Sequence, residues 1–119
     1  MKKAVSMEKD LQMSLKKQWF EMTKAGIKTE DYREINDYWK TRLTDQKAIW
    51  QRPKSMWKFK QFKTNVMTLG YPKATDSERI LKLEHKGIEI RTGNPEWGAE
   101  PGKLYFVIMH GKIIDNEEM

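Results

Sequence analysis

Three side chains that could hold an anion or move a proton lie close together in the first third of the chain. They are Lys28, Asp31 and Arg33, in the stretch GIKTEDYRE that begins at Gly26. In an extended segment side chains alternate between two faces, so Asp31 and Arg33 share one face and Lys28 points to the other. A bend after Gly26 would let Lys28 and Asp31 converge, which would keep Asp31 ionised and make Lys28 a proton donor, base or anion anchor. The alternative is an ordinary solvated charged surface.

A second stretch interleaves basic residues with aromatic rings. It is WQRPKSMWKFKQFK, residues 50–63, with five Lys or Arg side chains among two Trp and two Phe. Proteins that bind single-stranded nucleic acid use cations for the phosphates and rings for base stacking. The same pattern fits an amphipathic strand whose rings are core and whose lysines are solvated, so both interpretations stay open.

Composition excludes several kinds of site. The chain has no cysteine, so it has neither a disulfide framework nor a thiolate metal site. His85 and His110 are isolated, no cluster has metal-ligand spacing, and no P-loop, GxGxxG or GxSxG motif occurs. A lone histidine near a strand end is more often structural or exposed than catalytic. We therefore expect no metal and no cofactor.

The formal net charge of +6 favours polyanionic partners, because each phosphate that is neutralised releases counterions. A basic surface that only aids solubility is the alternative. No stretch approaches the roughly 20 apolar residues of a spanning helix, and no apolar segment follows the basic N-terminus. We expect a cytoplasmic protein without membrane insertion or secretion.

Patterns in the first half of the chain predict a strand and two helices. LQMSL at 11–15 alternates like a strand that is buried on one face. Leu15, Trp19 and Met22 then recur at helical spacing, and Gly26 is placed to end that helix in a left-handed conformation. KTEDYRE suits a short edge strand or pocket wall. In INDYWKTRL the apolar residues again recur at helical spacing, and its aromatics favour the core over a site.

The second half predicts β structure. Strands are expected in WKFKQFKTNVMTLGY, RILKLEH, GIEI and KLYFVIMH, the last of them central because it is apolar on both sides. Turns are expected at 70–72, 85–87, 93–95, 99–102 and 110–111. The chain should thus form one α+β domain at 9–114, a small β-barrel of five or six mainly antiparallel strands with two helices in the N-terminal half. Residues 1–8 should be a flexible arm and 115–119 an acidic tail.

Two long stretches resemble a small ASCH-domain protein of the bacterial, prophage or phage type. They are LQMSLKKQWFEMTKAGIKTEDYREINDYW and GNPEWGAEPGKLYFVIMHGKII. The family signature has the form GxKxxExR, which is met here as Gly26, Lys28, Asp31 and Arg33. The resemblance implies a PUA-like β-barrel with a cleft near the signature, in a superfamily associated with RNA and modified nucleosides.

The resemblance also implies two possible activities. Some members of the broader group deacylate an acetylated cytidine nucleoside with a lysine, a threonine and a glutamate, and others are assigned ribonuclease activity. Lys28 matches the lysine. Asp31 stands where the deacylating members have their threonine, and Thr29 is not equivalent to it. The candidates for the glutamate are Glu78, Glu84 and Glu96, and none of them is favoured.

We therefore expect a protein that binds single-stranded RNA or a modified nucleoside or nucleotide. In this hypothesis Lys28 and Arg33 contact phosphate or base edges, and Asp31 accepts a hydrogen bond from a base or orients Lys28. The candidates for a stacking face are Tyr32, Trp39 and Trp57.

Two alternatives belong to other classes of function. One is a hydrolase that acts without a metal on an acylated nucleoside or on RNA, with Lys28 as base and Asp31 or Thr29 as its partner. The other is a phage factor that binds a host protein through the basic aromatic surface.

Overall fold

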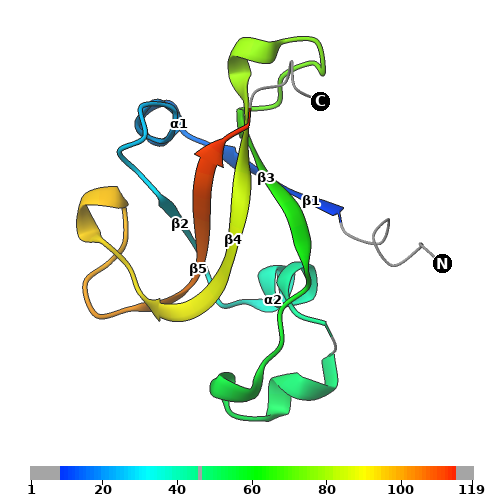
Figure 1. Cartoon of the computed structure of the whole chain (residues 1–119). Coiled ribbons are helices and arrows are strands. Elements are labelled where there is room, and N and C mark those ends of the chain that lie inside the picture. The colour runs from blue at the N-terminus through cyan, green and yellow to red at the C-terminus, as the bar shows by residue number, and fades with distance from the viewer. Residues whose placement is uncertain (1–8, 46, 115–119) are drawn as a thin grey trace, which may run out of the picture. The chain divides into compact units, whose positions relative to one another are not determined.

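A computed structural model of the chain describes residues 9–45 and 47–114 (Figure 1). These residues fall into two compact units. Unit 1 contains described residues 9–29, 61–86 and 109–114, and unit 2 contains 30–45, 47–60 and 87–108. Each unit is therefore assembled from segments that are far apart in the sequence.

The described part of the chain has five strands and two α-helices. The strands form one sheet in the order β1-β3-β4-β5-β2, in which β1 pairs parallel with β3 and β3 pairs antiparallel with β4. The predicted α+β class, with five strands and both helices in the N-terminal half, is confirmed. The elements are β1 (Lys9–Leu15), α1 (Lys17–Lys24), β2 (Glu30–Arg33), α2 (Asp37–Leu43), β3 (Phe62–Leu69), β4 (Ile80–Thr92) and β5 (Leu104–Ile113), with short 3-10 helices η2 (Lys47–Gln51), η3 (Lys54–Met56), η4 (Ser77–Arg79) and η5 (Pro95–Trp97).

In unit 1 the first strand and the end of the first helix lie as predicted. The alternating apolar residues of β1 are buried. Gly26 has φ 79°, its N–H donates to the Thr23 carbonyl, and the Ile27 N–H donates to the Met22 carbonyl, both at 3.0 Å. These two bonds form a Schellman cap. The Lys28 N–H also donates to the Met22 carbonyl, at 3.1 Å, so the cap fixes the backbone of Lys28.

The buried face of α1 differs from the prediction. Its buried residues are Phe20 and Thr23, whereas Trp19 and Met22 are only partly buried. The predicted face counted Leu15 as helical, but Leu15 ends β1 and α1 begins at Lys17. The buried face of α1 is consequently the one that carries Phe20 and Thr23.

Two predicted turns are wrong. Strand β4 continues through residues 85–87, and β5 continues through 110–111. Gly87 keeps its place in β4 with φ 120°, because strand pairing on a long ladder outweighs the local preference of glycine for a turn. At Gly111 a Cβ atom would lie 2.2 Å from Glu84 Oε1, so the glycine there permits a close approach and does not mark a turn.

In unit 2 the short strand β2 lies at one edge of the sheet, beside β5, as predicted. Residues 105–108 of β5 are all buried, which agrees with the central position expected for this strand. Helix α2 begins at Asn36, whose Oδ1 accepts a hydrogen bond from the Trp39 N–H at 2.9 Å. Only Leu43 of this helix is buried, and Tyr38 is 61% exposed. The prediction that the aromatic residues of this helix belong to the core is therefore wrong. A helix of two turns at the edge of a small unit packs through one residue only.

Gly26→Ala should lower the free energy of unfolding by about 1 kcal/mol, because an L-residue at φ 79° is strained. No atom lies within 4 Å of the position that a Cβ would take, so the cost is conformational and not steric. Urea denaturation measures it. Gly26→Asn is the matched variant and should lose less, since asparagine tolerates this conformation. An alanine variant as stable as the parent would mean that the cap does not hold this turn.

Candidate functional site

Strand β2 directs its side chains to two faces, in the alternation that the sequence predicts. On one face the Tyr32 hydroxyl donates to Glu30 Oε1 at 2.8 Å. On the other, the negative charge of Asp31 acts on the guanidinium of Arg33. The two faces have different roles, which can be described separately.

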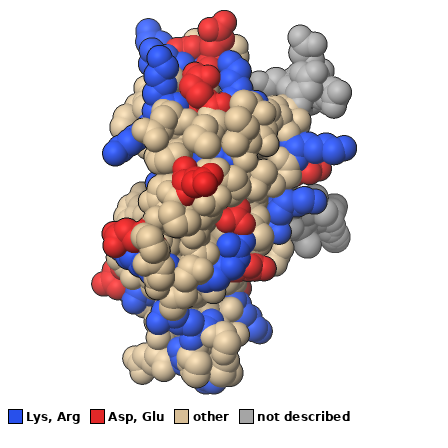
Figure 2. All heavy atoms as spheres, turned by 90° about the vertical axis from the view of Figure 1, so that its left-hand side faces the viewer, with Lys and Arg blue, Asp and Glu red and all other residues tan. Residues whose placement is uncertain are grey.

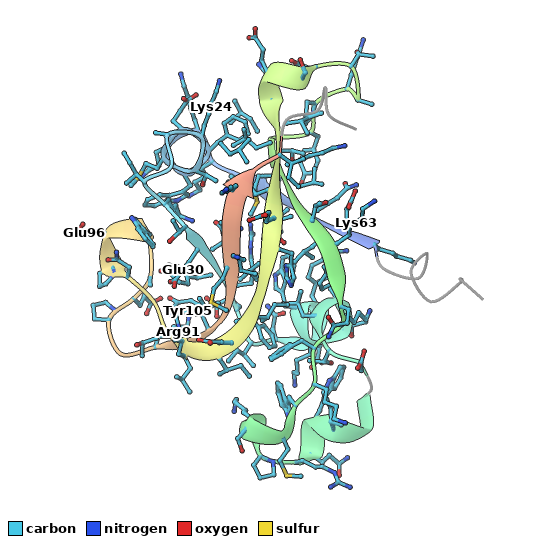
Figure 3. All side chains as sticks on the ribbon, in the orientation of Figure 1. Lys24, Glu30, Lys63, Arg91, Glu96 and Tyr105 are labelled. Atoms are coloured by element: carbon cyan, nitrogen blue, oxygen red, sulfur yellow. The ribbon has the colours of Figure 1, made fainter. Side chains whose placement is uncertain are left out.

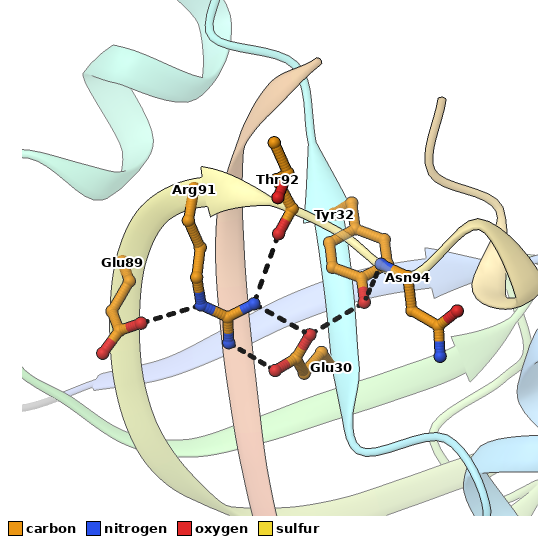
Figure 4. A network of polar contacts seen from close by, with 6 residues as sticks. All are labelled: Glu30, Tyr32, Glu89, Arg91, Thr92 and Asn94. Carbon is orange, nitrogen blue, oxygen red and sulfur yellow. Dashed lines mark hydrogen bonds and ion pairs between the residues drawn. The ribbon is translucent and has the colours of Figure 1, made fainter. Parts of the chain in front are cut away.

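The first face carries a polar network that ties β2 to β4 and to the chain after it (Figure 4). Arg91 donates to both carboxylate oxygens of Glu30 and, at 2.9 Å, to Glu89. The Tyr32 hydroxyl accepts a hydrogen bond from the Asn94 N–H at 2.9 Å. Hydrogen bonds to Glu30 and then to Glu89 raise the pKa of Arg91. The network therefore holds its arginine fully charged.

Tyr32 is committed to this network. Burial, followed by the carboxylate of Glu30, raises the pKa of Tyr32 to about 12, although the bond from Asn94 opposes the shift. Its ring lies 5.8 Å from that of Tyr105, and a Cβ on Gly93 would meet the ring at 2.6 Å. Glu30, Arg91 and Tyr105 are labelled in this part of unit 2 in Figure 3. A stacking role for Tyr32 stays a prediction, whereas its structural role is evident from these contacts.

The second face continues onto α2 and forms what we call the arginine–tryptophan cluster: Arg33, Tyr38, Trp39 and Arg42. The guanidinium carbons of Arg33 and Arg42 lie 5.1 Å and 5.4 Å from the centre of the Trp39 ring. Arg42 also lies 5.5 Å from the Tyr38 ring, which meets Trp39 edge-on at 5.0 Å. Two cations and two aromatic rings are thus in mutual contact.

The electrostatics distinguish the two arginines of the cluster. Burial lowers the pKa of Arg33, and the positive charge of Arg42 contributes in the same direction. The charge of Asp31, itself a buried carboxylate, opposes both effects. Arg33 therefore stays charged with the help of Asp31, while Arg42 is a half-buried residue of α2.

Lys28, the lysine of the predicted site, belongs to unit 1. Lys28 is 2% exposed, and its ammonium lies 5.7 Å from the centre of the Trp19 ring. The Thr29 side chain is exposed, and its carbonyl accepts a hydrogen bond from the His110 N–H at 3.0 Å. Lys28 belongs to unit 1 and Asp31 to unit 2, so their convergence stays a prediction.

Trp57, a predicted stacking residue, is built into the interior of unit 2. It is buried, its ring lies 6.3 Å from that of Phe106, and its Nε1 donates to the Arg52 carbonyl at 3.0 Å. The ammonium of Lys54 lies over the ring at 5.8 Å. Tyr38, which the sequence interpretation assigned to the core, is the more exposed ring.

A buried polar group in unit 1 was missed by sequence reasoning. The fully buried Asn65 bridges two histidines: its Nδ2 lies 2.7 Å from His110 Nδ1, and its Oδ1 lies 2.7 Å from His85 Nδ1. Nδ2 also donates to the Met109 carbonyl at 3.2 Å, which fixes the orientation of the amide because a carbonyl only accepts. It follows that His110 Nδ1 accepts and that His85 Nδ1 donates.

A bulge in β3 prepares this arrangement. The pairing of β1 with β3 shifts from Lys9↔Phe62 to Leu11↔Asn65, so β3 contains one extra residue there. The extra residue brings the Phe62 and Asn65 side chains to the same face. Both then meet His85, whose ring lies edge-on to Phe62 at 5.4 Å. No pattern in the sequence indicated this arrangement.

Charges on the surface are unevenly distributed along the chain. The face drawn in Figure 2 shows basic and acidic side chains interspersed. Residues 37–60 of the sequence, in contrast, contain seven basic and two acidic residues. The acidic Asp37 lies 3.4 Å from the ammonium of Lys40. Unit 2 therefore carries a concentrated basic segment beside the arginine–tryptophan cluster.

Within residues 9–45 and 47–114, no helix combines the length and apolar character that crossing a membrane requires. The same residues contain no group of three or more His, Cys, Asp or Glu side chains placed to hold a metal ion. No protein-family model, curated protein or solved structure matches the chain. Membership of the ASCH family accordingly stays a prediction.

Acid should destabilise unit 1 through His85. Burial, and then the neighbouring His110, lower the pKa of His85 below 6.5. Above pH 6.5 the folded and unfolded chains both hold this imidazole neutral. As the pH falls from 6.5 toward 5 the unfolded chain takes up the proton first, so the free energy of unfolding decreases. The slope should stay below the one-proton limit of about 1.4 kcal/mol per pH unit, since the ring is partly exposed.

Urea denaturation between pH 7 and pH 5 tests this dependence. His85→Gln is the comparison, because its amide can still donate to Asn65 but does not titrate. Its slope over this range should be shallower than that of the parent. Equal slopes for the two proteins would exclude His85 as the source of the acid sensitivity.

Proposed function

We propose that unit 2 binds a nucleotide or single-stranded nucleic acid, RNA in particular, at the arginine–tryptophan cluster. The observation that supports this proposal is the contact of two guanidinium groups with one indole, beside a tyrosine that is 61% exposed. Guanidinium groups match the geometry of phosphate oxygens, and an exposed aromatic ring stacks on any base. The cluster offers both kinds of contact within a few ångströms.

The two arginines would do different work. Arg42 lies on α2 against the exposed Tyr38 ring, at 5.5 Å, and is suited to contact a phosphate. Arg33 is more deeply placed, and the charge of Asp31 favours its ionised form. We assign to Arg33 the support of the Trp39 ring and a positive potential beneath the ligand. Asp31 then acts through Arg33 rather than on the ligand.

Contacts within the protein position the residues of the cluster, which lowers the entropic cost of binding. Asn36 caps α2 through the Trp39 N–H, so the helix turn that carries Tyr38 has a fixed start. The Trp39 ring is held on its sides by cations and on its edge by Tyr38. A base could stack on the Tyr38 ring of this edge-on pair.

Tyr38→Ala and Arg42→Gln should each weaken binding of a fluorescent single-stranded oligouridylate at low salt by roughly five- to 100-fold. This range corresponds to the ~1–3 kcal/mol that one stacked base contributes. Fluorescence anisotropy measures the affinity, and circular dichroism checks folding. Tyr71→Ala is the matched control, since Tyr71 is a 94% exposed tyrosine of unit 1. The proposal fails if the parent does not bind, or if Tyr38→Ala binds as well as Tyr71→Ala.

A further inference from the structure

The chain between α2 and β3 forms a closed excursion within unit 2. Thr44 and Phe59 form an antiparallel bridge at its base. The Asp45 N–H donates to the Lys58 carbonyl at 3.0 Å, and the Lys60 N–H donates to the Leu43 carbonyl at 2.9 Å. The ends of the segment are thus hydrogen-bonded to each other. We call residues 47–58 the basic excursion; η2 and η3 form most of it (Figure 1).

Two tryptophans hold the excursion in one conformation. Trp50 Nε1 donates to Thr44 Oγ1 at 2.8 Å, at the base of the segment. Trp57 is buried against Phe106 and donates to the Arg52 carbonyl. Within η3 the Met56 N–H donates to the Pro53 carbonyl at 2.8 Å. Local helical turns and two anchored indoles therefore fix a segment that has no strand partner.

The outer side of the excursion is basic and exposed. Residues 51–56 are all exposed, and so is Lys58. The backbone carbonyl of Arg52 accepts the hydrogen bond from Trp57, and the side chain of Arg52 is exposed. The cations of Arg52, Lys54 and Lys58 are thus carried on an ordered backbone. Three exposed cations within residues 52–58 suit a partner that carries several negative charges.

We infer that the basic excursion is a preformed phosphate clamp for a single-stranded nucleic acid whose base stacks on Tyr38. This inference rests on the proposed function of the arginine–tryptophan cluster and extends it. Charge complementarity favours a nucleic acid, because residues 37–60 contain seven basic and two acidic residues and one of the acids, Asp37, is paired with Lys40. The chain runs directly from α2 into the excursion, so one strand can reach both. Unit 2 should accordingly prefer an oligonucleotide to a mononucleotide.

The salt dependence of binding tests the clamp. Each phosphate contact on a single strand contributes about 0.7 to the slope of log K against log salt. The triple variant Arg52→Gln, Lys54→Gln, Lys58→Gln should therefore reduce the slope for oligouridylate by up to about 2. Its affinity for uridine monophosphate should match that of the parent, since the cluster is unchanged. None of the three side chains anchors the backbone by a hydrogen bond described above.

A matched control removes the same charge elsewhere. Lys16, Lys17 and Lys24 are exposed residues of unit 1, at or within α1. Their triple replacement by glutamine should leave the oligouridylate slope unchanged. An equal reduction in both triple variants would show a general effect of net charge and would overturn the clamp.

The remaining outcomes separate the clamp from the cluster. If the excursion variant keeps the parental slope while Tyr38→Ala weakens binding, the clamp is wrong and the proposed function stands. If the excursion variant loses slope while Tyr38→Ala has no effect, phosphates bind without the cluster and the proposed function fails. The excursion variant could instead lose binding to phosphatidylserine vesicles and bind oligouridylate like the parent. That outcome would assign the excursion to a membrane surface and overturn the inference.

Discussion

The alternation of side chains along β2 is the constraint on which unit 2 depends. Four residues supply two opposed faces, and each face is used fully. Glu30 and Tyr32 join Arg91 and Asn94 in a network that positions the strand. Because that network fixes one face, Arg33 on the other face meets Trp39 at a defined distance of 5.1 Å. A slip of one residue would exchange the faces and put the structural carboxylate where the arginine belongs.

Tryptophan has two uses in unit 2, and the polar N–H of the indole distinguishes them. Trp50 and Trp57 each donate to an oxygen inside the unit, so their rings act as anchors for the backbone. Trp39 of α2 instead is half-buried, and two guanidinium groups lie within 5.4 Å of the centre of its ring. A buried indole needs a hydrogen-bond partner, whereas a ring at the surface can serve as a platform. The rings of the basic aromatic segment therefore include anchors and its cations are exposed, while its binding of nucleic acid stays a prediction.

Local sequence patterns predicted the helices and strands of this chain better than they predicted its polar contacts. Alternation found β1, and a glycine after a helical repeat found the cap at Gly26. The same preference for glycine turns wrongly interrupted β4 and β5, since it takes no account of strand pairing. The bridge formed by Asn65 had no sequence signal, because its partners His85 and His110 are 20 and 45 residues away and meet only after the strands pair.

The candidate site was predicted in part for a similar reason. Period-2 spacing predicts Asp31 and Arg33 on a common face, and the charge of Asp31 favours the ionised form of Arg33. Tyr38 was assigned to the core because helical periodicity counts apolar rings without knowing which neighbours will cover them. Its actual neighbours are Trp39 and the guanidinium of Arg42, and neither buries it.

The parallel pairing of β1 with β3 also has a consequence for folding. Lys9 pairs with Phe62, and the amide of Asn65 in β3 needs the Met109 carbonyl and the His110 ring. The polar centre of unit 1 is therefore incomplete until residue 110 has been synthesised, although β1 precedes every other described element in the chain. Contacts between segments this far apart in the sequence slow folding, and strands formed early keep unpaired edges until their partners are present. Among the described elements, the first strand pairs with a strand whose buried asparagine meets its partners only in the last one.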